Sequence, residues 1–180
     1  MPTNIEIKAR TRDPEGLAIR AAALSDGPAR VLVQRDTFFR CLHGRLKVRE
    51  LADGHAELIW YDRSDTAGTK RSDYLVTPVA DAAGLRAVLG ESLGVTRVVE
   101  KTRRLFLAGQ TRIHLDAVKD LGDFVELEVV LREGQSESEG HAIAADLMHR
   151  LGIDEADLLE GAYADMLART DDPSGFQVRR

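Results

Sequence analysis

Charged side chains recur at every second position in several short segments of this chain. The segments carry Glu6, Lys8 and Arg10; Arg45, Lys47 and Arg49; Lys101 and Arg103; Arg112, His114 and Asp116; and Glu126 and Glu128. The signs are sorted, with cations in the second and third segments and carboxylates in the last. Several Lys and Arg side chains together can neutralise a polyphosphate, and carboxylate oxygens are the ligands that Mg²⁺ prefers. The set therefore predicts metal-dependent phosphoryl chemistry.

A period of two is that of a β-strand, whose successive side chains point to opposite faces. We predict strands over residues 4–10, 31–41, 45–51, 56–63, 70–79, 95–107, 111–118 and 124–132. We predict helices over residues 14–23, 81–93, 137–151 and 155–168. Short turns such as Asp53-Gly54 favour antiparallel neighbours. The pattern predicts an α+β fold, a closed eight-stranded antiparallel β-barrel with helices packed outside.

The orientation of the charged faces decides what the barrel contains. In an ordinary antiparallel sheet each polar face meets water, and this interpretation is open for any single strand here. The helices, however, need apolar surface to cover, and the strands supply it only if their apolar faces point outward. The charged faces then line the inside, where unpaired charges cost several kcal/mol each. A highly charged ligand with its metal ions would compensate them.

The chain has 180 residues and 43% hydrophobic residues, which suits one domain. We expect that domain over residues 1–169 and a flexible C-terminal tail over residues 170–180. The net charge of −5 argues against nucleic acid as a partner, and no apolar run is long enough to span a bilayer. Cys41 has no cysteine partner, so we expect a cytoplasmic protein. The sequence leaves a homodimer open.

Seven motifs together resemble the CYTH, or triphosphate-tunnel, superfamily, and they fall in that family's order. They are Asn4-Ile-Glu-Ile-Lys8, Gln34-x-Asp36, Gly44-Arg-Leu-Lys-Val-Arg-Glu50, Val99-x-Lys101-x-Arg103, Arg112-x-His-x-Asp116, Phe124-Val-Glu-Leu-Glu128 and Leu159-Glu-Gly-Ala-Tyr163. Each motif alone is weak. Their order over nearly the whole chain, from about residue 4 to residue 167, is specific.

The resemblance implies roles for the charged residues. Mg²⁺ or Mn²⁺ would be held by Glu6, Asp116, Glu126 and Glu128. A small-molecule triphosphate would be bound by Lys8, Lys47, Arg49, Lys101, Arg103 and Arg112. Second-rank candidates are Arg10, Arg45, Arg63, Arg71 and His114, and no catalytic residue is assigned.

The family includes class IV adenylate cyclases, thiamine triphosphatases and inorganic tripolyphosphatases. The resemblance implies a class IV adenylate cyclase-like enzyme that converts ATP to cyclic AMP and pyrophosphate. Alternatives are an inorganic tripolyphosphatase or nucleoside triphosphatase, and a non-catalytic module that binds polyphosphate or nucleotide. Asn4 replaces a family carboxylate, which puts a second metal ion in doubt. Phe38 and Ile59 stand where thiamine triphosphatases carry Tyr and Lys, which argues against that activity.

Overall fold

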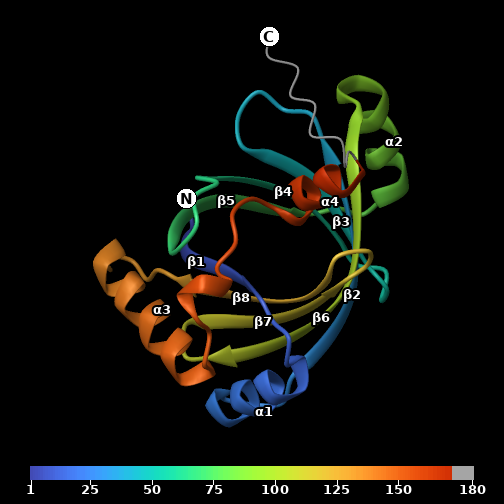
Figure 1. Cartoon of the computed structure of the whole chain (residues 1–180). Helices are drawn as coiled ribbons and strands as arrows, with labels where there is room; N and C mark the ends of the chain where they lie inside the picture. The colour runs from blue at the N-terminus through green and yellow to red at the C-terminus, as the bar shows by residue number, and fades with distance from the viewer. Residues whose placement is uncertain (172–180) are drawn as a thin grey trace.

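A closed β-barrel forms the centre of the protein, as Figure 1 shows along its axis. The computed structural model describes residues 1–171. The strands are β1 (Thr3–Arg10), β2 (Arg30–Phe39), β3 (Arg45–Leu51), β4 (Ala56–Arg63), β5 (Lys70–Pro78), β6 (Val95–Ala108), β7 (Thr111–Val118) and β8 (Gly122–Val130). Their order around the barrel is β1-β5-β4-β3-β2-β6-β7-β8, with every pair antiparallel. The predicted fold class is confirmed.

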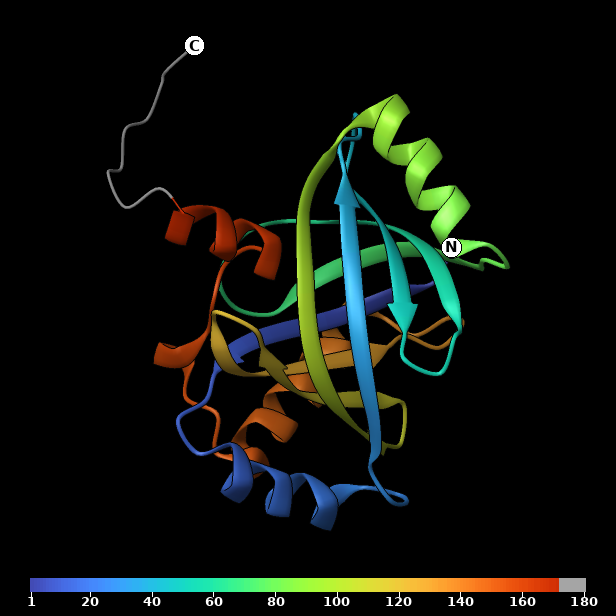
Figure 2. The same cartoon turned by 90° about the vertical axis from the view of Figure 1, so that its right-hand side faces the viewer.

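The apolar strand faces point outward and are covered by helices. The helices are α1 (Pro14–Leu24), α2 (Ala82–Leu93), α3 (Glu137–Leu151) and α4 (Tyr163–Asp171), with a short 3-10 turn η1 (Glu155–Asp157) before α4. Side chains of α1 and α3, such as Leu17 and Leu147, pack with Ile7, Ile113 and Leu127 of the barrel. Each such side chain stabilises the fold by about 1.5–3 kcal/mol when fully buried. In Figures 1 and 2, α1 and α3 lie on one side of the barrel and α2 lies on another.

Polar side chains cap the N-termini of α1, α2 and α3. The carboxylate of Asp13 accepts a hydrogen bond from the Gly16 amide at 2.9 Å at the start of α1, and Asp81 does the same for Gly84 before α2. Ser136 and Glu139 form a capping box at the start of α3. None of the helices in residues 1–171 is both long and apolar enough to cross a membrane.

One predicted helix is wrong. Residues 155–168 do not form a single helix, because the chain is extended between η1 and α4. Leu158 pairs with Ala9 of β1, and the Leu159 amide donates to the Lys8 carbonyl at 2.8 Å. Gly161 then adopts φ +74°, a left-handed conformation that favours glycine. The segment 158–163 is therefore held against the end of β1, and in Figure 1 it runs across the front of the barrel toward α4. The predicted tail lies outside the described residues, apart from 170 and 171, which end α4.

Candidate active site

The lumen of the barrel is a cavity of about 520 Å³ lined by polar and charged side chains. Of the residues predicted to hold metal or phosphate, the lining includes Glu6, Lys8, Lys47, Arg49, Lys101, Arg103, Arg112, Glu126 and Glu128. All of them sit at alternate positions on their strands, so the outward apolar packing forces them inward. A cavity of this size is in the range of small-molecule sites.

Four cations form what we call the cationic wall: Lys47 and Arg49 on β3, and Lys101 and Arg103 on β6. Strand β2 lies between these two strands and brings Asp36 to them. Asp36 is 2% exposed, and it accepts from Lys47 Nζ at 2.7 Å and from Arg49 Nε and Nη2 at 2.8 Å each. One buried carboxylate thus compensates both cations of β3.

Asp116 compensates the two cations of β6 in the same way. Its carboxylate accepts from Lys101 Nζ at 3.0 Å and from Arg103 Nε and Nη2 at 2.6 Å each. The Asp116 side chain is 0% exposed. Burial alone would raise the pKa of Asp116, but Arg103 and Lys101 outweigh burial and hold that pKa below its ordinary value. The carboxylate is therefore ionised, and its oxygens face cations.

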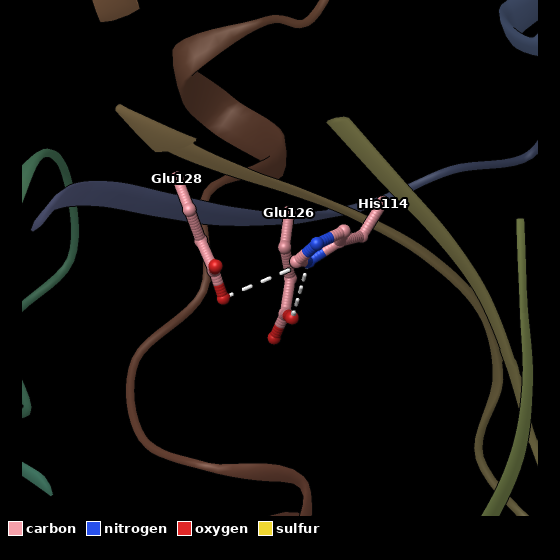
Figure 3. Close-up of side chains that lie close together, drawn as sticks. All are labelled: His114, Glu126 and Glu128. Carbon is pink, nitrogen blue, oxygen red and sulfur yellow. Dashed lines mark ion pairs between the residues drawn. The ribbon is translucent and has the colours of Figure 1, made fainter. Parts of the chain in front are cut away.

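His114 on β7 and the two glutamates of β8 form an acidic cluster (His114, Glu126 and Glu128). One ligand atom from each of these side chains lies within 4.8 Å of the other two. The Nδ1 atom of His114 lies 3.7 Å from a Glu126 oxygen and 3.6 Å from a Glu128 oxygen, and it has no hydrogen-bond partner within residues 1–171. Figure 3 shows the three side chains converging from the two strands.

The protonation states of the acidic cluster fit a divalent cation. Burial, and then the charge of Arg103, lower the pKa of His114, so its imidazole is neutral at pH 7 and can ligate metal. Burial alone would raise the pKa of Glu126, but Lys8 and other groups lower it below its ordinary value. Burial alone would also raise the pKa of Glu128, but His114 and Arg112 lower it below its ordinary value. Two carboxylates and a free imidazole nitrogen suit Mn²⁺ or Mg²⁺, with the imidazole favouring the softer ion.

Glu6 lies beside this cluster, because β1 pairs with β8 and places Glu6 opposite Glu128. The Glu6 carboxylate is hydrogen-bonded to Arg63. Asn4 lies one inward position further along β1, and its Oδ1 atom is buried without a hydrogen-bond partner in the part of the chain that the structure describes. A buried unpaired oxygen is costly, and a ligand or metal ion in the lumen would satisfy it.

Segment 158–163 covers one end of the lumen. The Gly161 carbonyl accepts from Lys8 Nζ at 3.4 Å and from Arg63 Nη2 at 2.9 Å. The Lys8 ammonium also lies 3.7 Å from the centroid of the Tyr163 ring, which packs on Phe124 at 5.0 Å between ring centroids. Ala162 and Tyr163 line the cavity. The chain itself thus closes the barrel at this end.

The second-rank candidates divide between the lumen and the surface. Arg63 and His114 face the lumen. Arg45 lies near the closed end, bridging Asp65 at 2.7 Å and Asp165 of α4 at 2.8 Å. Two others are engaged elsewhere: Arg10 is exposed and donates to the Leu121 carbonyl, and Arg71 is ion-paired with Asp73 and Glu137.

Several residues that line or shape this site were not assigned a role from the sequence. They are Asp36, Gln34, Tyr61, Tyr163 and the Gly161 carbonyl. Asp36 and Gln34 share the inward phase of β2, so the alternation does place them in the lumen. Their partners lie on other strands, and only the register shows that Asp36 stands opposite Arg49. Phe38 and Ile59 also line the lumen.

The protonation state of the Lys47 amine should change when an anion binds in the lumen. Burial and the charge of neighbouring Arg49 lower the pKa of Lys47 to about 7, although the Asp36 carboxylate 2.7 Å away favours the ammonium form. A bound phosphate would favour the ammonium form. We therefore expect tripolyphosphate binding at pH 7.5 to be accompanied by net proton uptake at this residue.

Isothermal titration calorimetry in buffers of different ionisation enthalpy measures this proton uptake. The matched control is Lys47→Arg, whose guanidinium stays charged and should lack the contribution. EDTA in every titration removes metal effects. Equal uptake by the wild type and Lys47→Arg would contradict the assignment to Lys47.

The fold and the lumen together define a class of protein: a closed antiparallel barrel whose interior carries a cationic wall and an acidic cluster. The chain belongs to the CYTH domain family, which matches residues 2–163. Proteins of this family are in general metalloenzymes that process triphosphates. A comparison with curated proteins found no significant match.

Solved structures share the fold at low sequence identity. The PH1012 protein of Pyrococcus horikoshii has a TM-score of 0.79 and 24% identity, over 90% of this chain and 98% of that chain. A candidate adenylate cyclase of Vibrio parahaemolyticus has a TM-score of 0.71 and 16% identity, over 92% and 97% of the two chains. A Hippeastrum protein, described as a candidate adenylyl cyclase with a dominant triphosphatase activity, has a TM-score of 0.63 and 15% identity, over 93% and 96%.

Proposed function

We propose that this protein is a metal-dependent enzyme that binds a triphosphate in the barrel lumen and cleaves it there. The observation that carries the proposal is the sorted lumen, in which the cationic wall reaches the acidic cluster through Arg103 and Glu126 at 2.6 Å. Such a lumen offers positive groups to phosphate oxygens and carboxylates to a metal ion. Catalysis of phosphoryl transfer needs mainly positioning and charge stabilisation, which these groups supply.

Within this proposal the residues take distinct parts. Triphosphate oxygens would be bound by Lys8, Lys47, Arg49, Lys101, Arg103 and Arg112. Metal would be held by Glu126 and Glu128, with His114 and Glu6 beside them. When bound, a divalent ion supplies a Lewis acid that polarises phosphoryl oxygens. We assign Asp116 mainly as the counterion of Lys101 and Arg103, because its oxygens accept from both and it lies outside the converging group of His114, Glu126 and Glu128.

The narrowest label is class IV adenylate cyclase-like, with ATP giving cyclic AMP and pyrophosphate. Hydrolysis of tripolyphosphate or of a nucleoside triphosphate is the alternative, and the description of the Hippeastrum protein favours keeping it. Cyclisation uses the substrate's own ribose hydroxyl as the nucleophile, whereas hydrolysis requires a positioned water. The phosphate and metal groups would be shared by both reactions.

A product assay tests the proposal. Pure protein is incubated with ATP or tripolyphosphate and with Mg²⁺ or Mn²⁺, and the products are separated by chromatography. Cyclic AMP with pyrophosphate identifies a cyclase, and orthophosphate identifies a hydrolase. Intact substrate in every metal condition, from protein that still binds tripolyphosphate, would overturn the enzymatic proposal and leave a binding module. EDTA is the matched control and should abolish turnover.

A further inference from the structure

On three neighbouring strands, the inward side chains become apolar toward the same end of the lumen. Their inward residues, read toward that end, are Lys101, Arg103 and Leu105 on β6; Asp36, Gln34 and Leu32 on β2; and Lys47, Arg49 and Leu51 on β3. Each strand thus passes from charged or polar side chains to leucine. We call Leu32, Leu51 and Leu105 the leucine arc.

The strand register makes the leucine arc continuous. Leu32 lies opposite Arg103, and Leu105 lies opposite Arg30, so Leu32 and Leu105 are diagonal neighbours. Gln34 lies opposite Leu51, which makes Leu32 and Leu51 diagonal neighbours as well. Diagonal side chains on one face of a sheet are within reach of each other. The arc therefore forms one apolar wall directly beyond the cationic wall.

The leucine arc lies at the open end of the lumen. The opposite end is crossed by segment 158–163, and Phe38 near it is only 6% exposed. At the open end, Val76 is 46% exposed although it lines the cavity, and Arg30 is exposed too. The leucines are half-buried, so the apolar wall meets solvent when nothing covers it. An apolar surface inside a charged cavity calls for an apolar part of the ligand.

Glu57 on β4 adds a polar group to the same end. It lines the cavity, is half-buried, and lies diagonally next to Leu51. Its cross-strand neighbour Arg49 donates to Asp36 instead, and among residues 1–171 the Glu57 side chain makes no hydrogen bond or ion pair. A carboxylate here would repel a further phosphate group, and it can accept hydrogen bonds from hydroxyl or amino groups.

We propose that the leucine arc and Glu57 bind the uncharged organic part of the substrate, so that the substrate class is nucleoside triphosphates rather than inorganic tripolyphosphate. This inference rests on the proposed function, because it takes the triphosphate to lie along the cationic wall. The sugar and base then extend toward the open end, where the leucines pack on them and Glu57 accepts from a hydroxyl or amino group. Inorganic tripolyphosphate would leave the leucines uncovered.

Binding measurements on two variants test the inference. Isothermal titration calorimetry of the full chain in EDTA compares ATP with tripolyphosphate, because metal-dependent turnover cannot occur there. Leu32→Asn and Leu51→Asn should each weaken ATP binding by at least about tenfold, as expected for a polar group in an apolar contact. The same variants should change tripolyphosphate binding by less than about twofold, because that ligand does not reach the arc. Melting curves show that each variant is folded.

Two further variants sharpen the comparison. Val33→Asn is the matched control, because Val33 points outward between Leu32 and Gln34, and it should change neither affinity. Glu57→Gln should tighten tripolyphosphate binding and should not tighten ATP binding. Equal effects of Leu32→Asn and Leu51→Asn on both ligands, or no effect on either, would overturn the inference alone. Failure of folded wild type to bind either ligand would overturn the proposed function as well.

Discussion

Replacing Glu128 with glutamine is expected to lower metal-dependent turnover of a triphosphate by roughly a hundredfold or more. A bound metal ion contributes several kcal/mol of charge stabilisation, and 1.36 kcal/mol corresponds to a factor of ten. Glutamine keeps the size of the side chain and places an oxygen or nitrogen where the Glu128 carboxylate forms an ion pair with Arg112 Nε at 2.9 Å. The change therefore removes one negative charge from the acidic cluster and leaves the packing in place.

Steady-state kinetics over a range of Mg²⁺ and Mn²⁺ concentrations measure the effect. If the loss arises from metal binding, a higher metal concentration should restore part of the activity. The matched control is Glu100→Gln, which removes a carboxylate that pairs with Lys119 at 2.7 Å on the outer face of β6. Glu100→Gln should keep wild-type turnover. Full metal-dependent activity in Glu128→Gln would contradict a role in the acidic cluster.

Asp116→Asn is expected to destabilise the ligand-free protein by about 3–5 kcal/mol, the usual cost of removing one partner from a buried ion pair. Its partners Lys101 and Arg103 are 3% and 5% exposed at their side chains, so water cannot replace the lost charge. For a chain of this length the thermal midpoint should fall by roughly 6–20 °C. Added tripolyphosphate should stabilise the variant more than the wild type, because its charge would replace that of Asp116.

The stability difference between the wild type and Asp116→Asn should depend on pH in a definite direction. The folded pKa of Asp116 lies below its ordinary value, which is also its value in the unfolded chain. The stabilisation by Asp116 is thus full above about pH 4 to 5 and is lost as the pH falls toward the folded pKa. Wild type and Asp116→Asn should differ most near neutral pH and converge in acid.

Denaturant unfolding at several pH values, with and without tripolyphosphate, measures both effects. Asp146→Asn is the control, because among the described residues this surface side chain of α3 forms only an exposed ion pair with Arg150 at 3.5 Å. Its stability should change by no more than about 0.5 kcal/mol. An unchanged midpoint in Asp116→Asn, together with loss of Mn²⁺ binding, would show that Asp116 is a metal ligand and not a counterion.

Most of the fold could be predicted from the sequence, because the alternation of apolar and charged residues decides which face of each strand packs against the helices. In β3, Leu46 and Val48 alternate with charged residues, and the predicted bounds 45–51 match the structure. Helices that need apolar surface then leave only the lumen for the charged faces. The prediction failed at residues 155–168, where Leu158 and Leu159 suit a helix. Their backbone groups pair instead with β1, a tertiary contact that local periodicity does not contain.

The candidate site was less predictable than the fold. Alternation shows that Asp116 and Glu126 both face inward, but it does not show what each carboxylate contacts. Only the register and the curvature of the barrel place Asp116 between Lys101 and Arg103. They place Glu126 against Lys8 and Arg103 and also near His114. The leucine arc could not be predicted from the sequence either, because only the strand register brings its three leucines next to one another.

Because segment 158–163 covers one end of the lumen, we expect reaction products to leave through the opposite end and in a fixed order. When a triphosphate is split, the fragment nearer the open end must leave before the fragment held near Lys8 and Gly161 can follow. In steady-state kinetics, the fragment released last competes directly with the substrate, whereas the first one inhibits noncompetitively. Product-inhibition patterns would thus reveal which way round the substrate lies in the barrel.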